Sequence, residues 1–263
     1  QEMGPAAKFV EKEMPERIWK DSEKYIDRYY VIGKYAYNLA QKVLPKLKSK
    51  IIMTGWPKVD LWRAELLYGF NNSIKNLQKK YGNFILFSSD FGYNSQNRIN
   101  LTYQDFNTSI WKSSRENVLN EMNWAKNILE DYKKTIELIQ ELDKRTDIPL
   151  IIIRPHPTED LMEWKRVEKS LKRIKVIYEG EVSSWIYASS GVLHRGCTTA
   201  VQSYMAGIQA GFIVNKEERV FKTLSYKVSQ KLYNSNDIAK FCIENIGKKP
   251  ILPKEYIEAF SND

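Results

Sequence analysis

The chain has 263 residues, 43% of them hydrophobic and 28% charged, and a formal net charge of +9. This composition is typical of a globular chain with one large or two small domains, and it excludes an intrinsically disordered one. No apolar run approaches the roughly 18 residues that span a bilayer, and no signal peptide opens the sequence, so we expect a cytoplasmic protein. The chain does not begin with Met, which favours a processed chain or a fragment.

The positive charge and the scarcity of cysteine and histidine limit the partners. Lysines are spread along the chain, so the charge fits either a solvated surface or an anionic partner: a charged substrate, a membrane surface or nucleic acid. Zinc-finger, RNP and basic-zipper patterns are missing, and we expect no nucleic acid. With two cysteines and two histidines in all, we expect no disulfide framework, no metal site and no cofactor.

The first 65 residues contain two predicted strands, which are too few for a stable sheet on their own. In chain order we expect a helix over 11–28 broken near Pro15, a strand over 29–33, a helix over 34–44 and a strand over 50–55. The turn TGWPKVD (54–60) follows, where Asp60 is placed to cap the next helix. We therefore expect residues 1–65 to be the end of an amino-terminal α/β domain.

Residues 66–263 alternate between apolar runs and helical segments, which predicts a parallel α/β sheet with helices on both faces. The predicted strands are 83–92, 149–157, 174–180, 191–194 and 209–214. The predicted helices are 115–143, 158–173 with Thr158 as its cap, 182–190, 197–207 and a mainly helical C-terminal part. The polar segment 93–114 is predicted to be a long loop.

The stretch RPHP places Arg154 and His156 two residues apart at the end of an apolar strand, so both side chains should share one face. Prolines at 155 and 157 should stop the strand pairing there. Ligands of parallel α/β sheets bind at the carboxyl ends of strands, and an arginine beside an imidazole suits an anion. The alternative is a plain turn, with Arg154 paired to Glu159 and a surface histidine.

A second cluster, HRGCTT, covers residues 194–199 at the end of another predicted strand. Gly196 permits a tight turn into a helix, whose first N–H groups suit phosphate; hydroxyls at 198 and 199 and the charge of Arg195 add to this. The alternative is ordinary helix capping beside a buried structural histidine. A nucleophile pair of Cys197 and His194 is disfavoured, because a strand-to-helix turn seldom gives the geometry it needs.

The stretch SSDFG (88–92) also follows an apolar strand, and its serines and glycine could present N–H groups to a phosphate or to a second substrate. Both histidines of the chain thus lie at predicted strand ends, each beside an arginine.

Five stretches of the sequence carry a resemblance to a known family: TGWPKVDL, ILFSSDFG, IIIRPHPTED, the WI pair at 185–186 and HRGCTTAVQSYMAG. In these stretches the sequence resembles the bacterial surface-carbohydrate biosynthesis proteins. These are glycosyltransferase-like chains of the two-domain GT-B type. The sequence is similar, more distantly, to capsule Kdo transferases and to bacterial sialyltransferases with an HP motif. The similar region runs from about residue 25 to 215.

The resemblance implies a nucleotide-sugar donor site, with a CMP-linked acidic sugar or a UDP-sugar as donor and a glycan or glycolipid as acceptor, in cell-surface polysaccharide synthesis. It implies peripheral contact with the inner membrane. It implies catalytic roles for Arg154 and His156, beside the phosphate. The implied nucleotide-binding set is Ser88, Ser89, Gly92, Arg154, His156, Glu179, His194, Arg195, Gly196, Cys197, Thr198, Thr199 and Gln202.

Two departures from the family pattern affect these expectations. Family members usually carry Glu where this chain has Gln202, a position expected to bind ribose hydroxyls. Most of the amino-terminal domain, which holds the acceptor site in GT-B enzymes, is absent, so a partner chain, a homo-oligomer or a truncated form is expected. The alternatives are a glycerophosphate transferase, a sugar-nucleotide epimerase, or a basic anion-binding module that is not an enzyme.

Overall fold

The computed structural model describes residues 14–15, 18, 21–55, 62, 68–108, 115–217 and 223–248. A six-stranded sheet in the order β5-β4-β3-β6-β7-β8 dominates this part of the chain. Every neighbouring pair in it is parallel. Its strands are β3 (Phe84–Ser88), β4 (Leu150–Arg154), β5 (Lys175–Val176), β6 (Gly191–His194), β7 (Ala210–Ile213) and β8 (Gln230–Leu232).

Side chains of the sheet are apolar on both faces, as expected for parallel strands covered by helices on each side. Along β3, Ile85 and Phe87 belong to one buried cluster, while Phe84 and Leu86 belong to a second. This alternation follows from the two-residue repeat of a strand, and β4 repeats it with Ile151 and Ile153 against Ile152. The continuous apolar runs in the sequence are therefore the centre of the protein.

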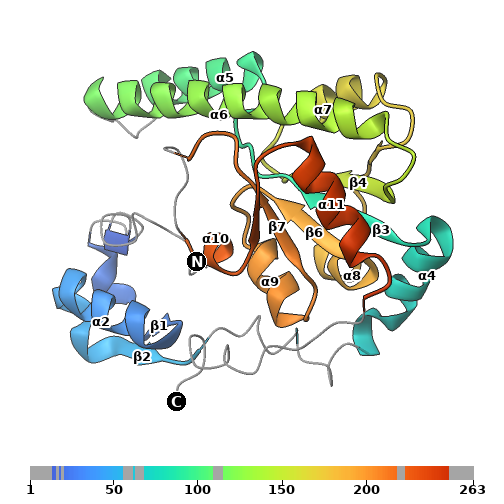
Figure 1. The fold of residues 1–263 in the computed structure, drawn as a ribbon. Coiled ribbons are helices and arrows are strands. Elements are labelled where there is room, and N and C mark those ends of the chain that lie inside the picture. Colours follow the sequence, from blue (N-terminus) through green and yellow to red (C-terminus); the bar gives the residue numbers. More distant parts are fainter. Residues whose placement is uncertain are drawn as a thin grey trace.

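Helices cover both faces of the sheet (Figure 1). Trp164 and Tyr132 pack edge to face at 5.1 Å between ring centroids, joining the two helices of one face that contain them. Trp185 packs against Phe84 on the other face. The helices are α4 (Asn71–Tyr81), α5 (Gln96–Thr108), α6 (Arg115–Asp143), α7 (Leu161–Glu168), α8 (Val182–Ala188), α9 (Thr199–Met205), α10 (Leu224–Lys227) and α11 (Ser235–Asn245).

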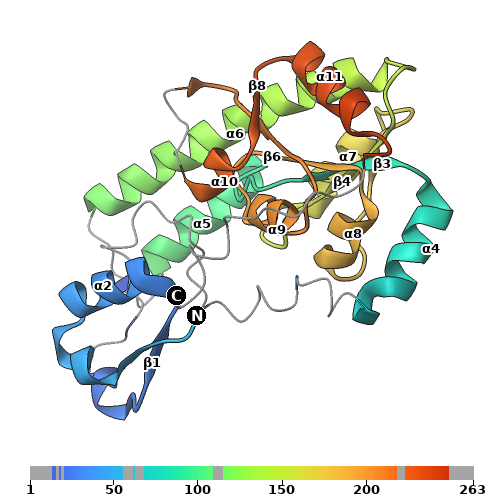
Figure 2. The ribbon, with the colours of Figure 1, turned by 60° about the horizontal axis from the view of Figure 1, so that its bottom comes forward.

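A small unit with a hydrophobic core of its own precedes this sheet in the chain. It contains a 3₁₀ turn (Ser22–Tyr25), β1 (Tyr29–Val31), α2 (Gly33–Val43), a 3₁₀ helix (Pro45–Lys50) and β2 (Ile51–Met53). β1 and β2 pair in parallel, and the core between them and α2 includes Leu39, Ala40 and Leu47. In Figure 1 it lies apart from the helices over the large sheet, and in the turned view of Figure 2 α2 lies below α5. Ile32 at its edge packs against the cluster of Trp62 and Val201.

The structure confirms the predicted fold class and the strands expected near 29–33, 50–55, 83–92, 149–157, 174–180, 191–194 and 209–214. The periodic helix over 115–143 is confirmed with its bounds unchanged. Ala125, Tyr132 and Ile139 of this helix are buried, and the last two belong to the same core cluster as residues of β3 and β4.

Four details of the prediction are wrong. Residues 96–108 form α5 where a loop was expected, and β8 adds a sixth strand in the C-terminal part. Asp160, and not Thr158, caps α7, because its carboxylate accepts from the N–H groups of Met162 and Glu163. Residues 22–25 of the predicted 11–28 helix form a 3₁₀ turn. The turn at 56–60 with Asp60, and most of 11–20, lie outside the described residues.

Candidate functional site at the carboxyl edge of the sheet

Three of the sequence clusters meet at one edge of the sheet. Ser88, the last residue of β3, is level with Arg154 of β4 on one side and with His194 of β6 on the other. The chain leaves β3 and returns to β4 on one side, and the later strands β6 to β8 extend the sheet on the other. This reversal is the topological switch point, where α/β sheets open a crevice for ligands. The clusters SSDFG, RPHP and HRGCTT all lie there.

Glu159 ties two of these loops together. Its carboxylate accepts hydrogen bonds from the Ser89 hydroxyl (2.6 Å), the Phe91 N–H (2.5 Å), the His156 N–H (3.1 Å) and the Trp164 indole N–H (2.7 Å). Burial raises the pKa of Glu159, and these four donors act in the opposite direction by favouring the carboxylate. Glu159 therefore fixes the backbone of both the SSDFG and the RPHP exits.

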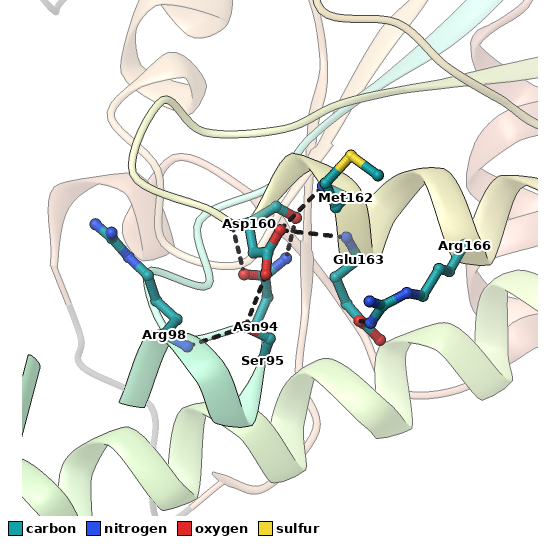
Figure 3. A network of polar contacts seen from close by, with 7 residues as sticks. All are labelled: Asn94, Ser95, Arg98, Asp160, Met162, Glu163 and Arg166. Atoms are coloured by element: carbon teal, nitrogen blue, oxygen red, sulfur yellow. Dashed lines mark hydrogen bonds and ion pairs between the residues drawn. The ribbon is translucent and has the colours of Figure 1, made fainter. Parts of the chain in front are cut away.

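A second network of hydrogen bonds continues this frame (Figure 3). The Asn94 side chain exchanges two hydrogen bonds with the backbone of Asp160, at 2.7 and 3.0 Å. The Asp160 carboxylate accepts from the Ser95 hydroxyl at 3.0 Å, in addition to capping α7. The Ser95 hydroxyl in turn accepts from the N–H of Arg98 at the start of α5. The exit of β3 is thus attached to the exit of β4 at several points.

The guanidinium of Arg154 forms hydrogen bonds to the backbone of the same chain. Its two terminal nitrogens donate to the carbonyls of Glu179 (2.6 Å) and Gly180 (2.5 Å), and the group lies 5.5 Å from the Tyr178 ring centroid. The Trp185 indole N–H donates to the same Glu179 carbonyl at 2.8 Å. The alternative pairing of Arg154 with Glu159 does not form. Arg154 holds the loop that follows β5, and the Glu179 side chain is exposed.

The two histidines have different environments. His156 is partly buried, and its Nδ1 lies 2.8 Å from the Thr158 hydroxyl. His194 is fully buried: its Nε2 lies 2.8 Å from the Ser229 hydroxyl, and its Nδ1 accepts from the Gly196 N–H. Burial lowers the pKa of His194 to about 3, so its ring is neutral. His194 is therefore a buried structural histidine, the alternative considered for this cluster, and its neutral ring adds no charge to an anion site.

Arg195 keeps its charge at the edge but is paired with the buried carboxylate of Asp131 from α6. Its guanidinium also lies 5.5 Å from the Phe91 ring centroid. Asn215 donates to the Asp131 carbonyl at 2.8 Å, so the α6 turn that holds Arg195 is itself fixed. The pairing orients the arginine at the β6 exit.

The remaining predicted residues of this cluster lie at the β6 exit and on α9. Cys197 is buried, burial raises the pKa of its thiol, and its sulfur lies 3.7 Å from the Ser88 hydroxyl, so a thiolate nucleophile is disfavoured. The Gln202 amide donates to the Ser183 hydroxyl at 2.6 Å. Thr198 is exposed, whereas the buried Thr199 hydroxyl has no hydrogen-bond partner among the described residues. α9 has only seven residues, so its N-terminus does not by itself define an anion site.

Sequence reasoning missed Asp90 and the central role of Glu159. Asp90 follows β3 by two residues and is partly buried. Burial raises its pKa, and the charges of His156 and Arg195 act in the opposite direction. The signal was present in SSDFG, whose carboxylate stands at the exit of the strand between the two Arg–His clusters. Within the described ranges no group of three or more His, Cys, Asp or Glu could hold a metal ion.

Comparison with known proteins gives relatives by structure alone. No protein-family model matches the chain, and no curated protein sequence matches it. It is similar to UDP-GlcNAc 2-epimerase of Methanocaldococcus jannaschii in complex with UDP-GlcNAc and UDP, with TM-score 0.53 and 15% identity over 90% of this chain and 57% of that one. A second structure of that epimerase gives TM-score 0.50 and 15% identity, over 92% of this chain and 60% of that one.

The wall teichoic acid polymerase TagF, soaked with CDPG, gives TM-score 0.48 and 10% identity over 88% of this chain and 51% of that one. The chain therefore spans little more than half the length of these proteins. The likeness establishes the fold, a GT-B-like architecture with a Rossmann-type parallel sheet. None of the helices in the described part is long and apolar enough to cross a membrane.

Proposed function

We propose that this chain carries the donor half of a nucleotide-sugar enzyme, a glycosyltransferase of cell-surface polysaccharide synthesis. The observation that carries the proposal is the meeting of SSDFG, RPHP and HRGCTT at the switch point of a GT-B-like sheet, where Glu159 holds SSDFG and RPHP together. Such an edge is where parallel sheets bind nucleotides. The chain spans about half the length of its structural relatives, so the acceptor side belongs to a further segment, a partner chain or a second copy.

The proposed roles follow the charges at this edge. His156, partly buried at the β4 exit, donates to the phosphate, and Arg195 adds positive potential from the β6 exit. Arg154 acts on the nucleotide through the 178–181 loop that it holds. As the acceptor hydroxyl oxygen bonds to the anomeric carbon and the bond from that carbon to the phosphate oxygen breaks, these side chains stabilise the charge that develops on the leaving nucleotide.

Two donor classes suit this arrangement: a CMP-linked acidic sugar, which the sequence resemblance implies, and a UDP-sugar, which the archaeal epimerase binds. Thr198 and the β3 exit would contact the phosphates, and Gln202 with Ser183 would lie by the ribose. A glycan or glycolipid at the inner membrane surface is the proposed acceptor.

A second candidate reaction is epimerisation of the sugar nucleotide, favoured by the likeness to the archaeal 2-epimerase fold. Incubation with UDP-N-acetylglucosamine separates the two. In the product of an epimerase the sugar is attached to UDP, whereas a transferase releases UDP when an acceptor glycan is present. A module that only binds anions would prefer long polyanions to mononucleotides, with steep salt dependence.

The binding proposal is tested by thermal denaturation with millimolar CMP, UDP, CMP-N-acetylneuraminate and UDP-N-acetylglucosamine. We expect at least one to raise the melting temperature, because a ligand of the native state stabilises it. His156→Ala should abolish that rise. Lys172→Ala, which removes an exposed cation at the opposite edge of the sheet, should retain it. If none of the four stabilises the wild-type protein, the proposal is wrong.

A further inference from the structure

Asp90 is placed where a bound ligand would meet three loops. Ser88, the last residue of β3, is level with Arg154 and with His194, and Asp90 follows it by two residues. β3 is flanked by β4 and β6, and the sheet reverses direction at this strand. Asp90 therefore stands at the switch point itself.

Asp90 differs from the other acids at this edge. Glu159 accepts four hydrogen bonds, Asp160 caps α7, and Asp131 is paired with Arg195. Within the described part of the chain no donor forms a hydrogen bond to the carboxylate of Asp90, although it is partly buried. Its oxygens therefore keep acceptor capacity for a ligand.

The charges around Asp90 come from both neighbouring loops. Burial raises the pKa of Asp90, and the charges of His156 at the β4 exit and Arg195 at the β6 exit act in the opposite direction. Across the β6 exit, its charge acts on the buried Cys197 thiol. In its ionised form the carboxylate repels a phosphate or a second carboxylate, and it accepts hydrogen bonds from hydroxyl or amide N–H groups.

We propose that Asp90 holds the sugar of the donor by accepting hydrogen bonds from its hydroxyl or amide groups, and so selects uncharged sugars over acidic ones. The inference rests on the proposed function and decides between its two donor classes. The phosphates are held by the cations on either side, and the carboxylate between them marks where the phosphates end and the sugar begins. The CMP-linked acidic sugar is the donor that this geometry disfavours.

The test compares Kd values from isothermal titration calorimetry at pH 7.5 for UDP, UDP-N-acetylglucosamine, CMP and CMP-N-acetylneuraminate. The variant is Asp90→Asn, which removes the charge and keeps the shape. The matched control is Asp147→Asn, which removes the same charge at the amino end of β4, beside Arg145. Thermal denaturation establishes that each variant is folded, and Asp90→Ser provides a second variant if Asp90→Asn does not fold.

We expect Asp90→Asn to weaken UDP-N-acetylglucosamine about tenfold relative to UDP, as is typical when a hydrogen bond to a charged group is lost. Binding of CMP-N-acetylneuraminate should instead become tighter relative to CMP, because a repulsion is removed. Asp147→Asn should change neither ratio. This opposite response of the two sugars is not produced by a purely structural role.

Three results would overturn the inference alone. The first two are both ratios within twofold of wild type in Asp90→Asn, and equal losses for the uncharged and the acidic sugar. The third is wild-type protein that binds UDP or CMP but neither sugar conjugate. In each case the nucleotide still binds, and the proposed function stands. Wild-type protein that binds none of the four compounds refutes the proposed function and the inference together.

Discussion

Replacing Glu159 by alanine should destabilise the protein strongly, because one carboxylate serves four donors. The Phe91 N–H, the His156 N–H, the Trp164 indole and the Ser89 hydroxyl would lose their acceptor in a site where Glu159 is only 9% exposed. A buried donor left without a partner costs about 1–3 kcal/mol. Relief of the carboxylate's own burial offsets part of this sum. We expect a net loss of about 3–5 kcal/mol, typical of breaking a buried charged network.

The loss is measured as the change in free energy of unfolding in urea, together with the melting temperature. For a chain of this size the melting temperature falls by about 2–4 °C for each kcal/mol of lost stability, so we expect a fall of roughly 6–20 °C. Glu163→Ala is the control: this glutamate forms a surface ion pair with Arg166, worth about 0–1 kcal/mol. Glu159→Gln keeps one acceptor oxygen and should lie between the two. A Glu159→Ala protein within 2 °C of wild type would refute the reasoning.

Three further predictions follow from single residues. Burial lowers the pKa of His194 to about 3 in the native state. Below about pH 6.5 the unfolded chain therefore binds a proton at this histidine, whereas the native state does not. The free energy of unfolding should fall by up to about 1.4 kcal/mol per pH unit below pH 6.5, and His194→Gln should lose that part of the slope in urea titrations. Gly211→Ala places a Cβ 2.5 Å from the Leu232 side chain and should cost about 1–3 kcal/mol, whereas Gly69→Ala meets nothing within 4 Å and should leave the melting temperature unchanged. Arg154→Lys cannot span both loop carbonyls and should weaken binding of whichever nucleotide stabilises the wild type, about tenfold by calorimetry.

The sheet could be predicted because its strands are apolar on both faces. Runs such as FILFS and LIIIR have no other place than the inside of a parallel sheet, and the positions of β3, β4 and β6 followed from them. α5 and β8 could not be predicted in this way. α5 carries mostly polar residues with weak periodicity, and β8 has three residues, of which only Leu232 is fully buried. Such elements depend on the tertiary structure around them more than on their own pattern.

The location of the candidate site could also be predicted, but the use of its residues could not. The spacing of RPHP and HRGCTT placed both at one edge of the sheet, as observed. Which donors and acceptors they meet depends on segments far away in the sequence. Arg154 meets carbonyls 25 and 26 residues later, and His194 meets Ser229, 35 residues later. No local pattern contains this information, and both residues therefore looked like ligand contacts.

We expect the RPHPTE segment (154–159) to divide into residues that build the edge and a residue that faces a ligand. Arg154 holds the 178–181 loop and Glu159 holds both strand exits, whereas the His156 ring has a hydrogen bond only to Thr158 among the described residues. Variants of Glu159 should therefore lower stability and nucleotide affinity together. Variants of His156 and Asp90 should change affinity with little loss of stability, and removal of the partly buried Asp90 charge should raise the melting temperature, because burial disfavours its ionised form. Measuring both quantities for the same three variants separates the frame from the ligand contacts, and a fall in stability for Asp90→Asn would place that residue in the frame.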